Sequence, residues 1–308
     1  MYRTLCTIVA IAGLAAPSLA RAQVELKHKF PDGRKTTLNR YVKVEQTLTI
    51  AGMEIPTSSE QNVKSSETNG TRNPDGTLES VHKIESLQAA IQVAGMELAF
   101  DSVNADAPPK GTALDALIDV YKAVAGSKWA ITYGQDNTIL SVKGSNEAIE
   151  NLPETLRAAI AKQFDPERIA KEGNQGMRVL PDGTVKKGDT WEREETVQFD
   201  SYQSMTFTIT YEYAGTVEKD GKPFDKITSK TTAVTYAMSA DSPSPLKITD
   251  SDLKIQESGG TILFDRAAGM IVETKDKRQI SGTLKCEVNG NELPGKLDLT
   301  FETSSNRS

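Results

Sequence analysis

The chain is poor in the residues that build metal and redox centres. Its 308 residues include only two histidines and two cysteines. These are too few for a histidine-rich metal centre, a zinc finger or a disulfide scaffold. The formal net charge is −6, whereas nucleic-acid-binding proteins usually carry a basic surface. We therefore expect no metal, no cofactor and no nucleic-acid partner.

The chain also lacks a long apolar run, and the one near its start is short. Arg3 precedes about 12 mostly apolar residues from Leu5 to Ala16, whereas a membrane-spanning helix needs about 20. The small residues Ala20 and Ala22 then fit an Ala-x-Ala cleavage site. We predict a signal peptide over residues 1–22, cleavage near Ala22, and export to the periplasm or the extracellular space. A retained membrane anchor is the alternative.

Cleavage would change the net charge and the cysteine count of the chain. It removes Arg3, Arg21 and Cys6 but no acidic residue, so the mature chain is more acidic by two charges. Cys286 is then the only cysteine, and no intramolecular disulfide can form. Its place on the apolar face of an alternating segment predicts a small buried hydrophobic residue rather than a reactive thiol. An exported chain without a disulfide depends on its packed core for stability.

The dominant pattern in the mature chain is period-two alternation, which is typical of strands with one buried face. From Met205 to Val217, apolar side chains occupy nearly every second position, and threonines fill most of the others. Similar alternation runs over residues 41–50 and 280–301. Turn-forming pairs with glycine second interrupt these runs and predict hairpin tips. The predicted tips are Ala51-Gly52, Ala94-Gly95, Asp220-Gly221 and Asn289-Gly290.

The middle of the chain changes to a helical period. Apolar residues over 114–124 recur at helical spacing, and a second helical stretch begins at Ser145 after a short predicted hairpin. Asp165-Pro166 is typical of an N-cap followed by the first helical residue, and predicts a third, short helix to about Glu172.

Together these patterns predict an α+β fold that is mostly β. We expect a long curved antiparallel sheet, or sheets, or a half-barrel, with two or three central helices packed on it. Residues 23–308 would form one β-rich domain. Similar hairpin tips near both ends suggest two related half-sheets, 24–104 and 189–303, joined by a helical segment over 110–172. Turn chemistry alone is an equal explanation for the similar tips.

No catalytic motif stands out in the sequence. It has no Gly-x-Ser-x-Gly, no Gly-rich phosphate loop and no dinucleotide fingerprint. Neither His28 nor His82 lies beside a serine in a recognisable motif. We predict no catalytic residues and no enzymatic activity. The alternative is a hydrolase, because two carboxylates far apart in sequence leave no signature.

The alternating strand and the first helix suggest a different kind of site. Their apolar faces either pack on each other or leave an apolar cleft for a lipid-like ligand. The residues predicted to line such a cleft are Met205, Phe207, Ile209, Tyr211 and Tyr213 on the strand, with Leu114, Ile118 and Tyr121 on the helix.

Three short motifs give the chain a resemblance to a known family. They are Phe30-Pro31-Asp32-Gly33, then Leu180-Pro181 with Gly188-Asp189-Thr190-Trp191, and Gly260-Thr261-Ile262-Leu263-Phe264-Asp265 with Gly269-Met270-Ile271. With its order of strands, central helices and strands, the chain resembles exported β-rich proteins of unknown function common in planctomycetes. That family has no established activity, so the resemblance implies no catalytic residue. It favours the periplasm over full secretion.

The sequence therefore favours a non-enzymatic role for an exported chain. We expect a binding module or an envelope-associated structural module, with a lipid or an envelope protein as partner. The first alternative is a periplasmic carrier of a lipid or lipoprotein tail held in an apolar half-barrel cleft. No stretch of the mature chain is apolar enough to predict a transmembrane segment.

Overall fold

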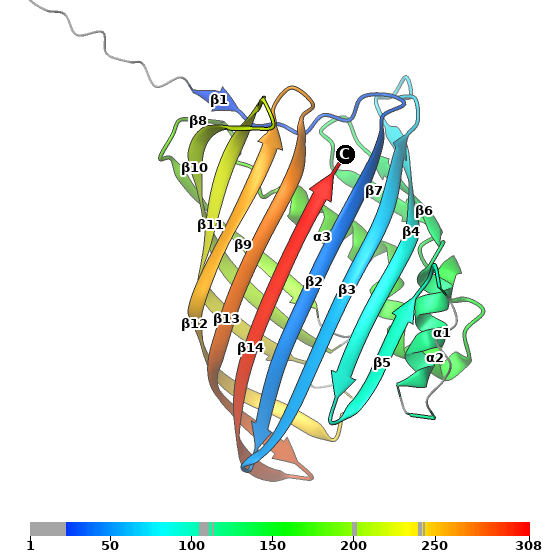
Figure 1. The fold of residues 1–308 in the computed structure, drawn as a ribbon, viewed down its shortest axis with the longest axis vertical. Coiled ribbons are helices and arrows are strands. Elements are labelled where there is room, and N and C mark those ends of the chain that lie inside the picture. The colour runs from blue at the N-terminus through cyan, green and yellow to red at the C-terminus, as the bar shows by residue number, and fades with distance from the viewer. Residues whose placement is uncertain (1–22, 105–110, 113, 199–201, 240–241, 243) are drawn as a thin grey trace, which may run out of the picture.

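The computed structural model describes residues 23–104, 111–112, 114–198, 202–239, 242 and 244–308. The signal peptide predicted over residues 1–22 lies outside the described residues. The described chain forms fourteen strands, three α-helices and two 3-10 helices (Figure 1). The prediction of a mostly β fold, with long curved antiparallel strands and central helices, is confirmed.

Twelve strands form one antiparallel sheet, and β1 (Val24–Glu25) with β8 (Thr184–Val185) forms a small second one. The large sheet contains β2 (Lys35–Ile50), β3 (Met53–Asn69), β4 (Leu78–Val93), β5 (Met96–Asp101), β6 (Lys128–Tyr133), β7 (Ile139–Lys143), β9 (Thr190–Gln198), β10 (Gln203–Lys219), β11 (Lys222–Met238), β12 (Leu246–Asp265), β13 (Met270–Val288) and β14 (Asn291–Arg307). Its order is β7-β6-β4-β3-β2-β14-β13-β12-β11-β10-β9, and β5 pairs with β4. Strand β14 therefore lies between β2 and β13 in the middle of the sheet (Figure 1).

The predicted hairpin tips are confirmed. Ala51-Gly52 joins β2 to β3, and Asn289-Gly290 joins β13 to β14, with all four residues at positive φ. Two consecutive residues at positive φ give a turn whose twist matches that of the flanking strands. The tight turns fix the register of the long strands, and β2 pairs with β3 along its whole length.

One face of the sheet is concave. A row of paired residues, which share a face, crosses it through Tyr211, Ser229, Gly260, Asp276, Thr303, Val42, Gln61 and Ala89. We call this the inner face. Arg278 on β13 contacts Glu195 on β9 at 2.8 Å although three strands separate them in the sheet order. The sheet therefore curls strongly toward its inner face.

The largest apolar cluster fills the inner face between β10 and β14. Alternate residues of β10 enter it, as the period-two pattern predicts, and Phe264 and Ile280 are among its most buried members. Cys286 is fully buried in the same cluster, and burial raises the pKa of its thiol. The expectation of a small buried hydrophobic cysteine is confirmed.

The helices differ from the predicted ones in two places. Helix α1 (Asp115–Val124) follows the predicted stripe, but the stretch from Ser145 is broken into η1 (Glu147–Ile149), α2 (Glu154–Ile160) and η2 (Ala161–Phe164). Pro153 ends any continuous helix there, because proline disfavours a helical conformation of the residue before it.

Helix α3 (Pro166–Met177) starts where Asp165-Pro166 predicts, with the Asp165 side chain accepting from two backbone N–H groups. It continues past the predicted end near Glu172, because packing on β7 outweighs the low helix propensity of Gly173 and Gly176.

Helix α3 bridges the two edge strands of the open sheet. At β7, the Asn174 amide accepts from the Ile139 N–H at 2.8 Å and donates to the Ile139 carbonyl at 3.1 Å. At β9, Arg168 donates to the Gln198 carbonyl at 3.4 Å, and the Trp191 indole donates to the Val179 carbonyl just after the helix. The helix and the residues that follow it therefore occupy the gap between β7 and β9.

Residues 26–34 form a strap across one end of the sheet (Figure 1). The Lys29 N–H donates to the Gly269 carbonyl at 2.9 Å, and the Gly33 N–H donates to the Gly70 carbonyl at 3.1 Å. The Asn137 amide donates to the His28 carbonyl at 3.1 Å. The strap thus ties together three hairpin turns that are far apart in the sequence.

Candidate functional site

A cavity of about 660 Å³ lies between α3 and the inner face of the sheet. We call it the α3 cavity. It is lined by residues of α3, β9 and four further strands, because the helix spans the gap between the sheet edges rather than packing flat on the sheet. The lining includes Arg168, Ile169, Glu172, Gly176, Val179, Arg193, Glu195, Val197, Tyr211, Ile262, Ile271, Thr274 and Arg40.

The lining of the α3 cavity is amphipathic. Ile262 and Ile271 line it from the apolar cluster of the sheet, and Ile169 lines it from the helix. The charged lining residues include three arginines, from β2, α3 and β9. A cavity with an apolar wall and a few placed charged groups suits a ligand that has both characters.

An ion group centred on the buried Arg278 lies against this cavity. Arg278 exposes 6% of its surface and contacts Glu195 and Asp276, each at 2.8 Å. Its guanidinium also lies 4.6 Å from the centre of the Phe207 ring. Burial lowers the pKa of Arg278, but Glu195 and Asp276 more than offset this, so its pKa is raised. The guanidinium therefore stays charged beside the two carboxylates, and it donates a hydrogen bond to Glu195 at 2.8 Å.

The same environment acts on its neighbours. Burial raises the pKa of Asp276, although the charge of Arg278 opposes the shift. Burial, with a further contribution from Glu195, raises the pKa of Tyr211 to about 12. Tyr211, which lines the cavity, therefore stays neutral even in mildly alkaline solution.

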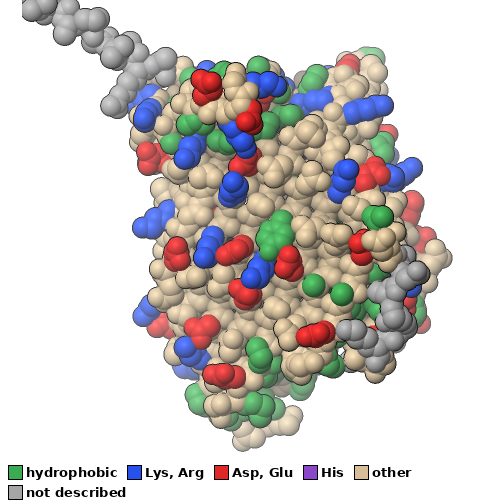
Figure 2. Space-filling view, viewed as in Figure 1, with side chains coloured by type: hydrophobic (Ala, Val, Ile, Leu, Met, Phe, Trp, Pro, Cys, Tyr) green, Lys and Arg blue, Asp and Glu red, His purple; other side chains and the backbone are tan. Residues whose placement is uncertain are grey.

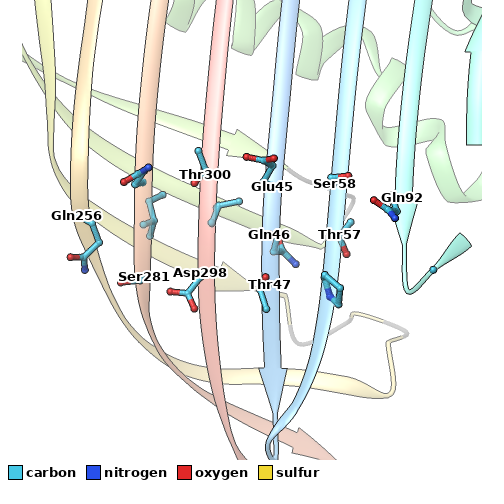
Figure 3. Close-up of a pocket in the computed structure, with 15 residues that line it drawn as sticks. Glu45, Gln46, Thr47, Thr57, Ser58, Gln92, Gln256, Ser281, Asp298 and Thr300 are labelled. Atoms are coloured by element: carbon cyan, nitrogen blue, oxygen red, sulfur yellow. The ribbon is translucent and has the colours of Figure 1, made fainter. Parts of the chain in front are cut away.

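A second pocket, of about 670 Å³, runs along six adjacent strands (Figure 3). Among its lining residues, Ile280 and Leu299 expose only 2% and 4% of their surface because they belong to the core. The pocket is otherwise lined largely by amides, hydroxyls and two carboxylates: Gln46, Gln92, Gln256, Gln279, Thr47, Thr57, Ser58, Ser281, Thr300, Glu45 and Asp298. It offers hydrogen bonds but no lysine, arginine or histidine. The face of the sheet seen in Figure 2 is likewise mainly polar, with basic and acidic side chains interspersed.

The described residues lack two features, a cluster of metal ligands and a membrane-spanning helix. In that part of the chain, no three side chains of the histidine, cysteine, aspartate or glutamate type come together as metal ligands. None of the described helices has the length and apolarity needed to cross a bilayer.

A family model matches residues 75–271, from the β3–β4 turn to the start of β13. The chain belongs to this family, a family of unknown function (DUF6263). The expected resemblance to a family of unknown function is confirmed at this level, while a planctomycete source stays a prediction. The DUF6263 match includes α3, β9 and Ile262, but not Arg40 or Thr274.

Comparison with other proteins adds only distant likenesses. No curated protein matches the chain. Similar solved structures include lipovitellin, at 11% identity and a TM-score of 0.38, covering 91% of this chain and 25% of that one. DynF from Micromonospora chersina has 9% identity and a TM-score of 0.19, covering 97% and 92%. The translocator domain of the autotransporter NalP from Neisseria meningitidis has 8% and 0.22, covering 91% and 90%. The DUF6263 chain thus spans about a quarter of the lipovitellin chain.

The structure separates the two sets of residues predicted to line an apolar cleft. Met205, Phe207, Ile209, Tyr211 and Tyr213 belong to the large cluster on the inner face, and only Tyr211 lines the α3 cavity.

The helical set packs elsewhere in the DUF6263 fold. Leu114, Ile118 and Tyr121 contact a cluster on β4 and β5 that includes Leu87 and Phe100. Helix α1 folds back onto the strands just before it in the sequence, so it does not face β10. Ligand binding by the eight predicted residues stays a prediction.

Sequence reasoning missed Arg40, Thr274 and the cavity side of α3. One signal was available, because Arg40 occupies the same alternating positions as Val42 and Val44. A charged residue in the apolar register of a strand points to an inner face that is not wholly filled by core. No local pattern indicates that Thr274 lies near it, since that depends on the pairing of β13, β14 and β2.

Proposed function

We propose that this protein is an exported, non-enzymatic binding protein that holds an amphipathic small molecule in the α3 cavity. One observation carries the proposal: a cavity of about 660 Å³ has aliphatic side chains on one part of its wall and arginines on another. Ligand sites in proteins are usually concavities of about 300–1,000 Å³, mostly apolar, with a few placed polar groups. Export rests on the signal peptide predicted over residues 1–22.

The arrangement of the buried charges supports binding over hydrolysis. A pair of catalytic carboxylates needs one group free to donate a proton and one free to accept or attack. Glu195 and Asp276, the carboxylates of the ion group beside the cavity, both contact Arg278 at 2.8 Å. Their charges are compensated within the protein, which suits a structural role for the group.

The ligand would enter beside α3. A groove of about 430 Å³ between α3 and β9 shares Arg168, Glu172, Thr196 and Gln198 with the α3 cavity. The contact between α3 and β9 is weak at this point. The hydrogen bond there, from Arg168 to the Gln198 carbonyl, is long at 3.4 Å. We therefore place the opening between α3 and β9 rather than between α3 and β7, where Asn174 makes two shorter bonds.

Co-purification tests the proposal directly. The mature protein would be isolated from its native envelope fraction, and an organic extract would be analysed by mass spectrometry. We expect one class of amphiphile in an amount close to that of the protein.

Gly176 offers a matched pair of variants for this experiment. It lines the cavity, and a Cβ added there meets no atom within 4 Å. Gly176→Leu should fill part of the cavity and reduce the amount of amphiphile, whereas Gly176→Ala should retain it. An empty wild-type protein, or equal loading of the wild type and Gly176→Leu, would contradict the proposal.

A further inference from the structure

We infer that the polar end of the ligand is an anion, a carboxylate or a phosphate ester, and that Arg40 binds it. This inference rests on the proposed function, because it assigns the head group of the ligand in the α3 cavity. Arg40 lies on the inner face of β2 and lines the cavity, and its side chain is exposed.

Arg40 differs from the other arginines of this interior in lacking a partner. Arg278 contacts Glu195, Arg307 contacts Glu67 at 3.4 Å, and Arg193 contacts Asp182 at 3.0 Å. Over the described ranges, the side chain of Arg40 makes neither an ion pair nor a hydrogen bond, whereas its backbone is paired in the sheet. The planar guanidinium matches carboxylate and phosphate oxygens with two parallel hydrogen bonds, so an uncompensated arginine in a cavity favours such an anion.

The acidic residues of the lining do not compensate Arg40. Glu195 is paired with Arg278, and Glu172 is paired with Arg168 at 2.7 Å. Glu194 precedes Glu195 on β9, so strand alternation directs its side chain to the opposite face. The positive charge of Arg40 is therefore left for a ligand.

The strand register places the parts of an amphipathic site in order. Ser305 lies opposite Arg40, Thr274 lies opposite Ser305, and Ile262 lies opposite Thr274. The two hydroxyls are 2.7 Å apart. One row across four strands thus passes from a cation through two hydroxyls to an aliphatic side chain. Because one hydroxyl donates to the other, a bound anion at Arg40 would have one free hydroxyl donor beside it and an apolar wall for its alkyl chain beyond.

Binding of matched single-chain amphiphiles tests the inference. Laurate, dodecyl phosphate and 1-dodecanol have the same chain length but different heads, and each would be titrated into the delipidated mature protein by calorimetry. We expect Arg40→Gln to weaken laurate or dodecyl phosphate by about tenfold to a hundredfold, which is typical of a lost hydrogen-bonded charge pair. Binding of 1-dodecanol should change less than about twofold, since uncharged partners lose little.

Two further variants separate shape from charge. Arg40→Lys keeps the charge but loses the planar fork, so its affinity should lie between those of the wild type and Arg40→Gln. Arg157→Gln removes an exposed arginine of α2 that lies outside the cavity lining, and should behave as wild type. Far-ultraviolet circular dichroism checks that each variant is folded.

The outcomes distinguish the inference from the proposed function. Equal affinities for all three amphiphiles, unchanged in Arg40→Gln, would overturn the role of Arg40 and leave the binding function standing. Failure of all three to bind the wild type would overturn both. If inorganic phosphate bound as tightly as dodecyl phosphate, the alkyl chain of the ligand would contribute nothing to the affinity. That result would overturn the amphipathic site.

Discussion

The inner face of the large sheet differs between two regions, one around β10 and one around β3. On β10, the inward Met205, Phe207 and Ile209 expose 3% of their surface or less. On β3, the inward Ser59 and Gln61 are polar and only half-buried. We call the first region the filled side and the second the polar side. Inward position alone therefore does not make a core, because the other elements must also reach and cover the side chains.

The difference explains where the α3 cavity lies. The curl of the sheet brings β9 and β10 against β13, so the filled side packs on itself. Arg40 of β2 has no such strand opposite, and α3 stands across the gap between the edge strands. The cavity is the space that remains between the filled side, the polar side and the helix.

The largest expected difference in stability is between two substitutions that shorten a side chain, one in each region. Phe207→Ala should lower the free energy of unfolding by about 3–5 kcal/mol, because it leaves a cavity in the filled side and exposes Arg278. Gln61→Ala on the polar side should change it by no more than about 0.5 kcal/mol. Urea unfolding followed by tryptophan fluorescence measures both. Similar costs at the two positions would remove the distinction.

Lowering the pH should destabilise the protein more through the filled side than through the polar side. His28 lies in the strap beside Phe264, and burial, with smaller effects of Arg307 and Arg34, lowers its pKa to about 4. The unfolded histidine has the higher pKa and binds a proton first, so stability is retained above about pH 6.5 and lost as the pH falls toward 4. The loss from this group should approach about 3 kcal/mol.

Unfolding free energies of the wild type and His28→Gln at several pH values measure this effect. His28→Gln should remove most of the pH dependence between 6.5 and 4. His82 on β4 provides the comparison on the other side, because burial also lowers its pKa while Glu67 opposes the shift. A larger change in the pH profile from His82→Gln than from His28→Gln would count against the expectation.

The hydrogen bonds that join α3 to β7 should make an intermediate contribution to the free energy of unfolding. Asn174→Ala removes both hydrogen bonds to Ile139, while the apolar contacts of Ile169 and Met177 with β7 remain. We expect a loss of about 1–3 kcal/mol. Hydrogen exchange should also become faster in α3 and β7, while β10 stays protected. Uniform loss of protection across the sheet would show that α3 is part of one cooperative unit.

The smallest effect is expected at the cavity surface of α3. Gly176→Ala should stabilise the protein by up to about 1 kcal/mol, because alanine is the better helix former and the added methyl group meets no atom within 4 Å. Gly173→Ala in the same helix is the control, since its Cβ would come within 2.4 Å of Ile139. Thermal unfolding of the two variants should therefore shift in opposite directions.

Local chemistry predicted much of this fold. The pairs Ala51-Gly52 and Asn289-Gly290 predict their hairpins because residues at positive φ are needed there, and Asp165-Pro166 predicts the start of α3 through capping. The alternation of β10 identified the inner side chains of the filled side. Each of these signals lies within a few residues of the structure that it predicts.

The site was not predictable in the same way. Arg40 and Thr274 meet only through the pairing of β2 with β14 and of β14 with β13, and no local pattern encodes that pairing. The predicted cleft paired β10 with the first helix because both are amphipathic, but α1 covers β4 and β5 instead. Amphipathicity shows that a helix packs on something, and chain connectivity decides on what.

The position of β14 has a consequence for how the protein folds as it is synthesised. Until its 17 residues have been synthesised, β2 pairs only with β3 and β13 only with β12, so each has one unpaired edge at the centre of the sheet. Exposed strand edges readily pair with other chains, and pairing between strands distant in sequence is slow. The two halves of the large sheet therefore cannot join until β14 has been made, and a chain truncated before β14 should be a target for chaperones and proteases.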